Sequence, residues 1–105
     1  MSSFVPDDGV DTGPIVLQKG GVEISPTETT STLFFEKLQP LGIDAMVEAT
    51  ELVASGRAKP LEQDERLATA HGLVDDTVAA IDLAAPAAEI DRLVRGCDPQ
   101  PGAFL

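Results

Sequence analysis

Residues 4–18 read FVPDDGVDTGPIVLQ and place an acidic turn directly before a short apolar run. Gly9 and Gly13 allow positive φ angles, and Pro14 disfavours a helical conformation at the residue before it. Asp11 is therefore predicted to lie on a tight, fixed bend, where its carboxylate can be directed at a ligand. The same residues also fit an Asx-turn, in which the carboxylate only satisfies backbone amides of its own turn.

The composition limits the class of protein. The chain has 105 residues, 43% of them hydrophobic, which suits one small domain or part of a larger one. Its net charge is −11, and only 7 lysines and arginines stand against 18 acidic residues, so nucleic acid is not an expected partner. The single cysteine, Cys97, cannot form an internal disulfide, and no CxxC pair or histidine cluster predicts a metal site. A reducing compartment, the cytoplasm, fits best.

The N-terminus and the hydropathy argue against export and membrane insertion. Residues 1–6 lack both the basic and the apolar region of a signal peptide. No stretch approaches the roughly 20 apolar residues that a membrane-spanning helix needs. We therefore expect no membrane partner.

The first half of the chain predicts a strand followed by a long helix. Alternation of apolar residues predicts a strand over 15–24, interrupted at Gly20-Gly21, which fits either a hairpin turn or a bulge. Ser25-Pro26-Thr27-Glu28 has the spacing of a capping box, so a helical turn should begin close to it. A helical stripe then runs through Pro40, which should kink or divide the helix, to a stop at Gly56. The stripe consists of Phe34, Leu38, Leu41, Ala45, Ala49 and Leu52.

The second half predicts a polar connection, a short strand and a short helix. Residues 57–76 mix charges and turn formers with little periodicity. Residues 78–83 are predicted as a short strand. Residues 86–95 begin with proline and pair Asp91 with Arg95 four positions apart, which predicts a helix, and Gly96 is expected to cap it in the left-handed conformation.

Three segments of the chain, residues 4–18, 29–56 and 95–103, occur in this order in folate-dependent formyltransferases. The chain resembles this family over nearly its whole length, in particular the hydrolase domain of 10-formyltetrahydrofolate dehydrogenases and their bacterial relatives. The resemblance implies an α/β fold, as part of a Rossmann-like formyltransferase domain. It also implies that residues 1–58 are the C-terminal portion of the catalytic domain, and residues 59–105 a connection and the start of the following subdomain.

The resemblance also implies a site and a substrate. The formyl donor would be 10-formyltetrahydrofolate, used without a metal for formyl transfer or hydrolysis, and Asp11 would be one of three catalytic residues. The residues expected to line the pterin end of the folate pocket are Pro6, Asp7, Asp8, Gly9 and Val10.

The other two catalytic residues of the family are an asparagine and a histidine in an upstream Asn-x-His motif, which this sequence does not contain. No motif supports transferring the catalytic role to His71. We therefore expect the second half of a split or truncated formyltransferase, inactive alone, that associates with an N-terminal half or with itself.

Two alternatives to this enzyme remain open. The chain can be a non-enzymatic remnant or subunit that associates with a complementary half. Asp11-Thr12-Gly13 is also the triplet of aspartic proteases, in which a homodimer shares a proton between two carboxylates, although such proteases are rich in strands. The sequence does not decide the formyl acceptor, which can be water, an amine, a sugar nucleotide or an aminoacyl-tRNA.

Overall fold

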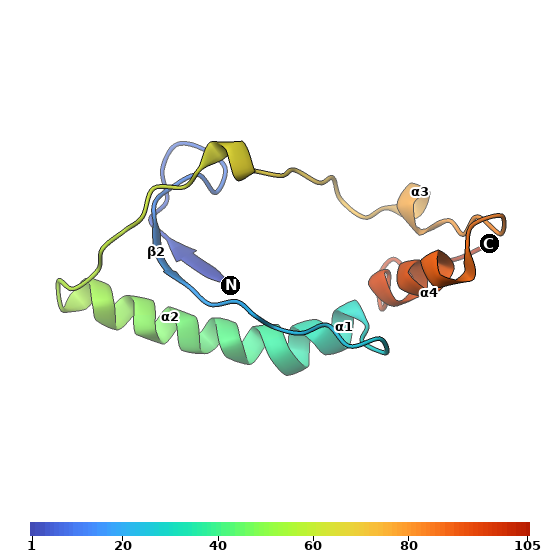
Figure 1. The fold of residues 1–105 in the computed structure, drawn as a ribbon, viewed down its shortest axis with the longest axis horizontal. Coiled ribbons are helices and arrows are strands. Elements are labelled where there is room, and N and C mark those ends of the chain that lie inside the picture. The colour runs from blue at the N-terminus through green and yellow to red at the C-terminus, as the bar shows by residue number, and fades with distance from the viewer. The chain divides into compact units, whose positions relative to one another are not determined.

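The computed structural model describes residues 1–105 and shows a mixed helix and strand protein (Figure 1). It divides into two compact units, one of residues 1–22 and 37–70, the other of residues 23–36 and 71–105. In chain order the elements are β1 (Ser2–Phe4), β2 (Ile15–Gln18), α1 (Thr30–Thr32), a π-helical turn (Leu33–Leu38), α2 (Gln39–Ala54), a 3₁₀ turn (Glu65–Leu67), α3 (Asp76–Ala79) and α4 (Ala87–Gly96). None of the helices is long and apolar enough to cross a membrane.

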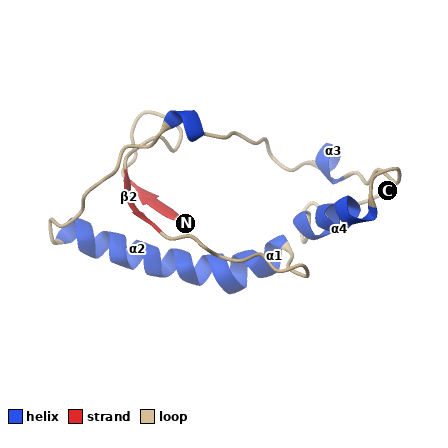
Figure 2. Ribbon diagram, in the orientation of Figure 1, coloured by secondary structure: helices blue, strands red, loops and turns tan.

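The first unit contains a two-stranded antiparallel sheet, drawn in red in Figure 2. β1 pairs with β2, and the register shifts between Ser3 and Phe4. On the other side of β2, Ile15 exchanges two backbone hydrogen bonds of 2.8 Å with Leu61. The strand predicted over 15–24 is confirmed for its first part and wrong for 22–24. Gly21, with φ 76°, turns the chain away, so Gly20-Gly21 forms neither a hairpin turn nor a bulge.

Helix α2 packs on both strands, as its apolar stripe predicts. Ala45 and Ala49 are buried, whereas the first residue of the stripe, Phe34, is 45% exposed. Pro40 divides the helix as predicted, because its ring and its missing N–H are tolerated only in the first turn of α2. The helix ends before Gly56, which has φ 68°.

The polar connection is largely exposed, as expected, but the strand predicted over 78–83 is wrong. The structure has helix α3 at Asp76–Ala79 instead, followed by a single bridge between Ala80 and Phe104. The Asp75 carboxylate accepts hydrogen bonds from the amides of Thr77 (2.9 Å) and Val78 (3.3 Å). This N-cap stabilises a helical turn over residues whose apolar pattern alone favours a strand.

The short helix predicted over 86–95 is confirmed as α4, with Asp91 and Arg95 paired at 2.9 Å. The left-handed cap at Gly96 is wrong. Gly96 is the last residue of α4, and Cys97 follows it with φ −90°. The positive φ in this region lies at Gly102 instead.

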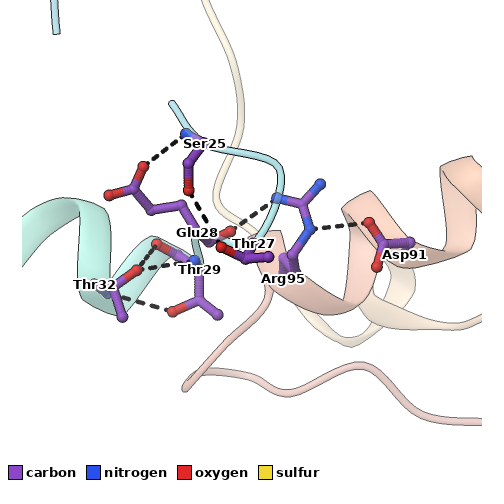
Figure 3. Close-up of polar contacts among 7 residues, drawn as sticks. All are labelled: Ser25, Thr27, Glu28, Thr29, Thr32, Asp91 and Arg95. Carbon is purple, nitrogen blue, oxygen red and sulfur yellow. Dashed lines mark hydrogen bonds and ion pairs between the residues drawn. The ribbon is translucent and has the colours of Figure 1, made fainter. Parts of the chain in front are cut away.

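Polar contacts fasten residues 25–30 to the end of α4 within the second unit (Figure 3). The Arg95 guanidinium donates to the backbone oxygen of Glu28 at 2.8 Å and to the Asp91 carboxylate at 2.9 Å. The Thr30 hydroxyl donates to the backbone oxygen of Gly96 at 2.7 Å. These bonds satisfy carbonyl groups that lack helical partners, one of them at the end of α4.

The helix start lies four residues after the predicted one. Thr29 is the N-cap, and its hydroxyl and that of Thr32 form a reciprocal capping box with the two backbone amides (Figure 3). At the predicted box, the Glu28 carboxylate accepts from the Ser25 amide at 2.8 Å, and residues 26 and 27 form a turn. The Ser25 spacing therefore marks a turn that leads into the helix.

We expect Arg95→Met to lower the free energy of unfolding by about 1 to 3 kcal/mol, because it removes two charge-assisted hydrogen bonds. The exposed Arg92 on the same helix offers the matched control, Arg92→Met, which should cost much less. Urea unfolding of both variants measures the difference, and equal losses would contradict this role of Arg95.

Candidate functional site

The loop between β1 and β2 carries every site residue predicted from the sequence. The amide of Val5 donates to the backbone oxygen of Pro14 at 3.0 Å and closes the base of the loop. All of residues 6–12 are exposed, and Val10 is 90% exposed although it is apolar. The site residues thus share one short, solvent-facing segment, and the name "acidic loop" is used below for residues 6–13.

Asp7 is the carboxylate that holds the acidic loop together. Its Oδ1 accepts hydrogen bonds from the Thr12 hydroxyl at 2.7 Å and from the Gly9 amide at 3.0 Å. The Thr12 hydroxyl, and after it the Gly9 amide, hold the pKa of Asp7 below its usual range, because both favour the ionised form. The Asx-turn considered from the sequence is therefore formed by Asp7, and the structure leaves the carboxylate of Asp11 exposed to solvent.

The sharp bend lies at Asp11, but its cause differs from the one predicted. Asp11 itself has φ 55°, whereas Gly9 and Gly13 do not adopt positive φ. Both glycines are needed for space instead. A Cβ at Gly9 would lie 2.0 Å from the Thr12 hydroxyl oxygen, and a Cβ at Gly13 would lie 1.7 Å from the backbone oxygen of Val5.

One residue near the acidic loop was missed by sequence reasoning. The Gln63 side-chain amide donates to the backbone oxygens of Asp11 (2.8 Å) and Gly13 (2.7 Å). Gln63 belongs to the polar connection, about fifty positions after the acidic loop in the chain. No local sequence pattern around Gln63 predicts the contact. The loop is thus held by Asp7 from inside and by Gln63 from outside.

A mainly apolar groove of about 490 Å³ lies between β1 and α2 in the first unit. Of the predicted site residues only Pro6 lines it, and Asp11 does not. The lining residues are Ser2, Ser3, Phe4, Val5, Pro6, Val16, Met46, Ala49, Thr50, Val53 and Ala54. The groove therefore adjoins one end of the acidic loop and leaves the carboxylates outside it.

The remaining candidates for chemistry lie outside the first unit. His71 is exposed and belongs to the second unit, as does Cys97, whose side chain is buried. No group of three or more histidine, cysteine or acidic side chains is arranged to hold a metal ion. Asp11 is the candidate reactive group that the structure places on a constrained turn.

We expect Asp7→Ala to destabilise the protein above about pH 4 and to matter progressively less in stronger acid. The pKa of Asp7 is lowered in the folded state, so the ionised carboxylate is favoured by folding. Its contribution is complete above the unfolded pKa of an aspartate, about 3.9, and disappears as the pH falls through the lower folded pKa. Urea unfolding of both chains over this pH range measures the effect, and a difference that stays constant into strong acid would contradict it.

Comparison with known proteins finds relatives that match almost the whole chain. The cytosolic 10-formyltetrahydrofolate dehydrogenase of Homo sapiens is 44% identical over 104 residues, which are 99% of this chain and 11% of that protein. The mitochondrial 10-formyltetrahydrofolate dehydrogenase of Mus musculus is 41% identical over 104 residues, with the same coverage. A methionyl-tRNA formyltransferase of Agathobacter rectalis is 37% identical over 98 residues, 93% of this chain and 31% of that protein.

The matches cover only a small part of each relative. The chain spans 11% of the length of the two dehydrogenases and 31% of the methionyl-tRNA formyltransferase. No protein-family model matches it. The resemblance stated from the three sequence segments is nevertheless confirmed, because two differently named kinds of enzyme each align with at least 93% of this chain. This chain belongs to the formyltransferase family.

Proposed function

We propose that this chain is part of an enzyme that uses 10-formyltetrahydrofolate for formyl transfer or hydrolysis, and that Asp11 is one of its catalytic residues. The observation that carries the proposal is that the two aspartates Asp7 and Asp11 have different roles in the acidic loop. The Asp7 carboxylate accepts from the Gly9 amide and the Thr12 hydroxyl within the loop. Asp11 is held at φ 55° with its carboxylate exposed to solvent.

An aspartate in this position suits formyl chemistry. When a nucleophile attacks the formyl carbon, the nucleophile loses a proton and the carbonyl oxygen gains negative charge. A carboxylate within hydrogen-bond reach can orient the attacking water or amine and accept its proton. The developing charge on oxygen needs donors, which an aspartate carboxylate does not supply, so other residues must provide them.

The acidic loop offers a surface suited to the pterin ring. A pterin presents amino and ring N–H donors on one edge and flat apolar faces. Asp8 provides an exposed carboxylate acceptor, and the exposed Val10 and Pro6 provide apolar contact area. We assign the folate-binding role to Pro6, Asp7, Asp8, Gly9 and Val10, with Asp7 and Gly9 acting mainly through the shape of the loop.

The hydrogen-bond donors that Asp11 cannot supply must come from a partner segment. The 105 residues contain no asparagine and a single histidine, so the Asn-x-His motif of the family must come from another segment or chain. We propose that an N-terminal half supplies it and that the chain is inactive alone. β1 has one partner strand, so its other edge is free to pair with a strand of the N-terminal half. The apolar groove lies beside β1, and two of its lining residues, Met46 and Val53, are each more than half exposed.

The free edge of β1 and the apolar groove can also be covered in other ways. A second copy of the chain can cover the groove instead, but two chains with a net charge of −11 repel each other, which favours a different partner. If no partner restores chemistry, the chain acts as a non-enzymatic remnant or subunit.

The relatives are named cytosolic and mitochondrial enzymes, and we place this chain in the cytoplasm.

The aspartic-protease alternative receives less support. Such an enzyme needs a strand-rich fold around its paired aspartates. Here the largest element is the sixteen-residue helix α2, and the sheet has two short strands. Cleavage of an unfolded protein at acidic pH, abolished in Asp11→Asn, would be needed to revive it.

Binding of tetrahydrofolate, the formyl-free product, tests the folate proposal. The chain, mixed with the part of a 10-formyltetrahydrofolate dehydrogenase that precedes the matched segment, is titrated and followed by ¹H–¹⁵N NMR. We expect the amides of Gly9, Val10 and Asp11 to shift in a saturable manner, while those of α4 stay unchanged. Saturable shifts confined to other regions, or none at all, would contradict a folate site at the acidic loop.

A further inference from the structure

The Gln63 side-chain amide ties the backbone of the acidic loop to the polar connection within the first unit. Its Nε2 lies 2.8 Å from the backbone oxygen of Asp11 and 2.7 Å from that of Gly13. An amide nitrogen carries two hydrogens, so each carbonyl can receive one of them. The pair of bonds therefore holds the Asp11–Thr12 and Gly13–Pro14 peptide units, one on each side of the Thr12–Gly13 unit.

The backbone dictates where Gln63 lies. Leu61 and Ile15 exchange two hydrogen bonds of 2.8 Å in an antiparallel bridge. Continuing that register by two residues places Gln63 opposite Gly13. Pro14, between Gly13 and Ile15, has no N–H, and its oxygen accepts from the amide of Val5, the residue after β1. The side chain of Gln63 thus continues the pairing of the connection with this strand beyond the last backbone bond.

The backbone conformation of Asp11 needs such support. A non-glycine residue at φ 55° is disfavoured unless its surroundings fix it, although aspartate tolerates it better than most. Gly13 is buried and Gln63 is half-buried, so the bond to the Gly13 carbonyl is partly shielded from water, whereas the bond to the Asp11 carbonyl is exposed. The Asp7 carboxylate accepts from the Gly9 amide and the Thr12 hydroxyl, but it makes no bond to the carbonyl of Asp11.

We propose that Gln63 is a positioning residue, which holds the Asp11 backbone at positive φ and so aims the Asp11 carboxylate at the formyl group. This inference rests on the proposed function for its catalytic meaning. Gln63 acts through the loop and does not itself touch the reacting atoms. A glutamine suits the task because its neutral amide donates two bonds without adding charge beside Asp7 and Asp11.

The test uses two variants and a matched control. Gln63→Leu keeps most of the volume and removes both donors, and Gln63→Glu keeps the shape but turns oxygen atoms toward two carbonyls. Gln18→Leu is the control, since the Gln18 amide donates to a single side chain, Ser2 Oγ, at 3.0 Å in the same unit. In each full-length variant, NMR reads the Asp11 ¹³Cα and ¹³Cβ shifts and its amide-to-α-proton coupling, which report φ.

We expect both Gln63 variants to move the Asp11 values away from those of a positive φ, while slow exchange of the Ile15 and Leu61 amides shows that the sheet persists. In the mixture with the N-terminal half, kcat for 10-formyltetrahydrofolate should fall by about 10- to 100-fold with little change in KM, because a misaimed group mainly affects the chemical step. Gln18→Leu should leave both readouts as in the wild type.

The outcomes separate the two proposals. A wild-type mixture without turnover overturns the formyl chemistry, and with it the catalytic meaning of Gln63. A wild-type mixture that turns over, with unchanged Asp11 shifts or unchanged kcat in Gln63→Leu, overturns the positioning role alone. A loss in kcat that Gln18→Leu reproduces would also overturn it, since the effect would then be general destabilisation.

Discussion

Asp11→Asn is expected to lower turnover of 10-formyltetrahydrofolate by about 10²- to 10⁴-fold in the mixture of this chain with an N-terminal half of a relative. The substitution keeps the size of the side chain and removes the basic carboxylate. Asparagine also tolerates the positive φ that residue 11 adopts, so the acidic loop should keep its conformation. The loss is therefore expected in kcat, with KM and stability close to those of the wild type.

The exposed Asp44 on α2 provides a charge-matched control, because Asp44→Asn removes the same charge from the same unit. We expect it to retain turnover within about threefold of the wild type. Single-turnover rates and far-ultraviolet circular dichroism of both variants give the comparison. An Asp11→Asn chain that keeps wild-type turnover would exclude Asp11 from the chemistry.

Gly13→Ala is expected to cost about 3 kcal/mol or more of unfolding free energy, because the added Cβ would make the closest contact found at any glycine of this chain. The added Cβ would lie 1.7 Å from the backbone oxygen of Val5 and 2.9 Å from its carbonyl carbon. Both are main-chain atoms, so the clash cannot be relieved by rotating a side chain. The Val5 to Pro14 hydrogen bond at the base of the loop must break, and β1 should separate from β2.

Gly20→Ala is the matched control, because a Cβ at Gly20 meets no atom within 4 Å and its φ is not positive. It should change stability by less than about 0.5 kcal/mol. Thermal and urea unfolding of the two variants measure the difference. If Gly13→Ala proved as stable as Gly20→Ala, the close approach of the loop to Val5 would be wrong.

The sequence was most informative where helical periodicity extended over ten residues or more. Helices α2 and α4 were both predicted from a helical apolar pattern, with Pro40 expected to kink or divide the first helix and Pro86 expected at the start of the second. The short β2 followed from the apolar run after the acidic loop. Each of these elements depends on residues that are near one another in the chain.

The two wrongly predicted strand segments, residues 22–24 and 78–83, were decided by contacts outside the local pattern. Val22 and Ile24 alternate as in a strand but have no partner strand, and strand formation depends on a partner. At residues 78 and 79 of the strand predicted over 78–83, the Asp75 cap outweighs a short apolar pattern. In both cases a local pattern fits two structures, and contacts outside it decide between them.

The candidate site was predicted in its position and only partly in its construction. The bend at Asp11 was expected, but the glycines beside it relieve close contacts instead of adopting positive φ. Gln63 was missed, because its role depends on a pairing register between segments far apart in the sequence. Sequence patterns point to a candidate reactive group more readily than to the groups that hold it.

The central claim is that this chain supplies the aspartate of a folate enzyme whose other catalytic groups lie in an N-terminal half. Release of tetrahydrofolate from 10-formyltetrahydrofolate tests it most directly, measured for this chain, for the N-terminal segment of a dehydrogenase relative, and for the two mixed. We predict release from the mixture alone, at a rate that saturates as either part is increased. A mixture in which the two parts associate and yet release no tetrahydrofolate would contradict the account and leave a subunit without formyl chemistry.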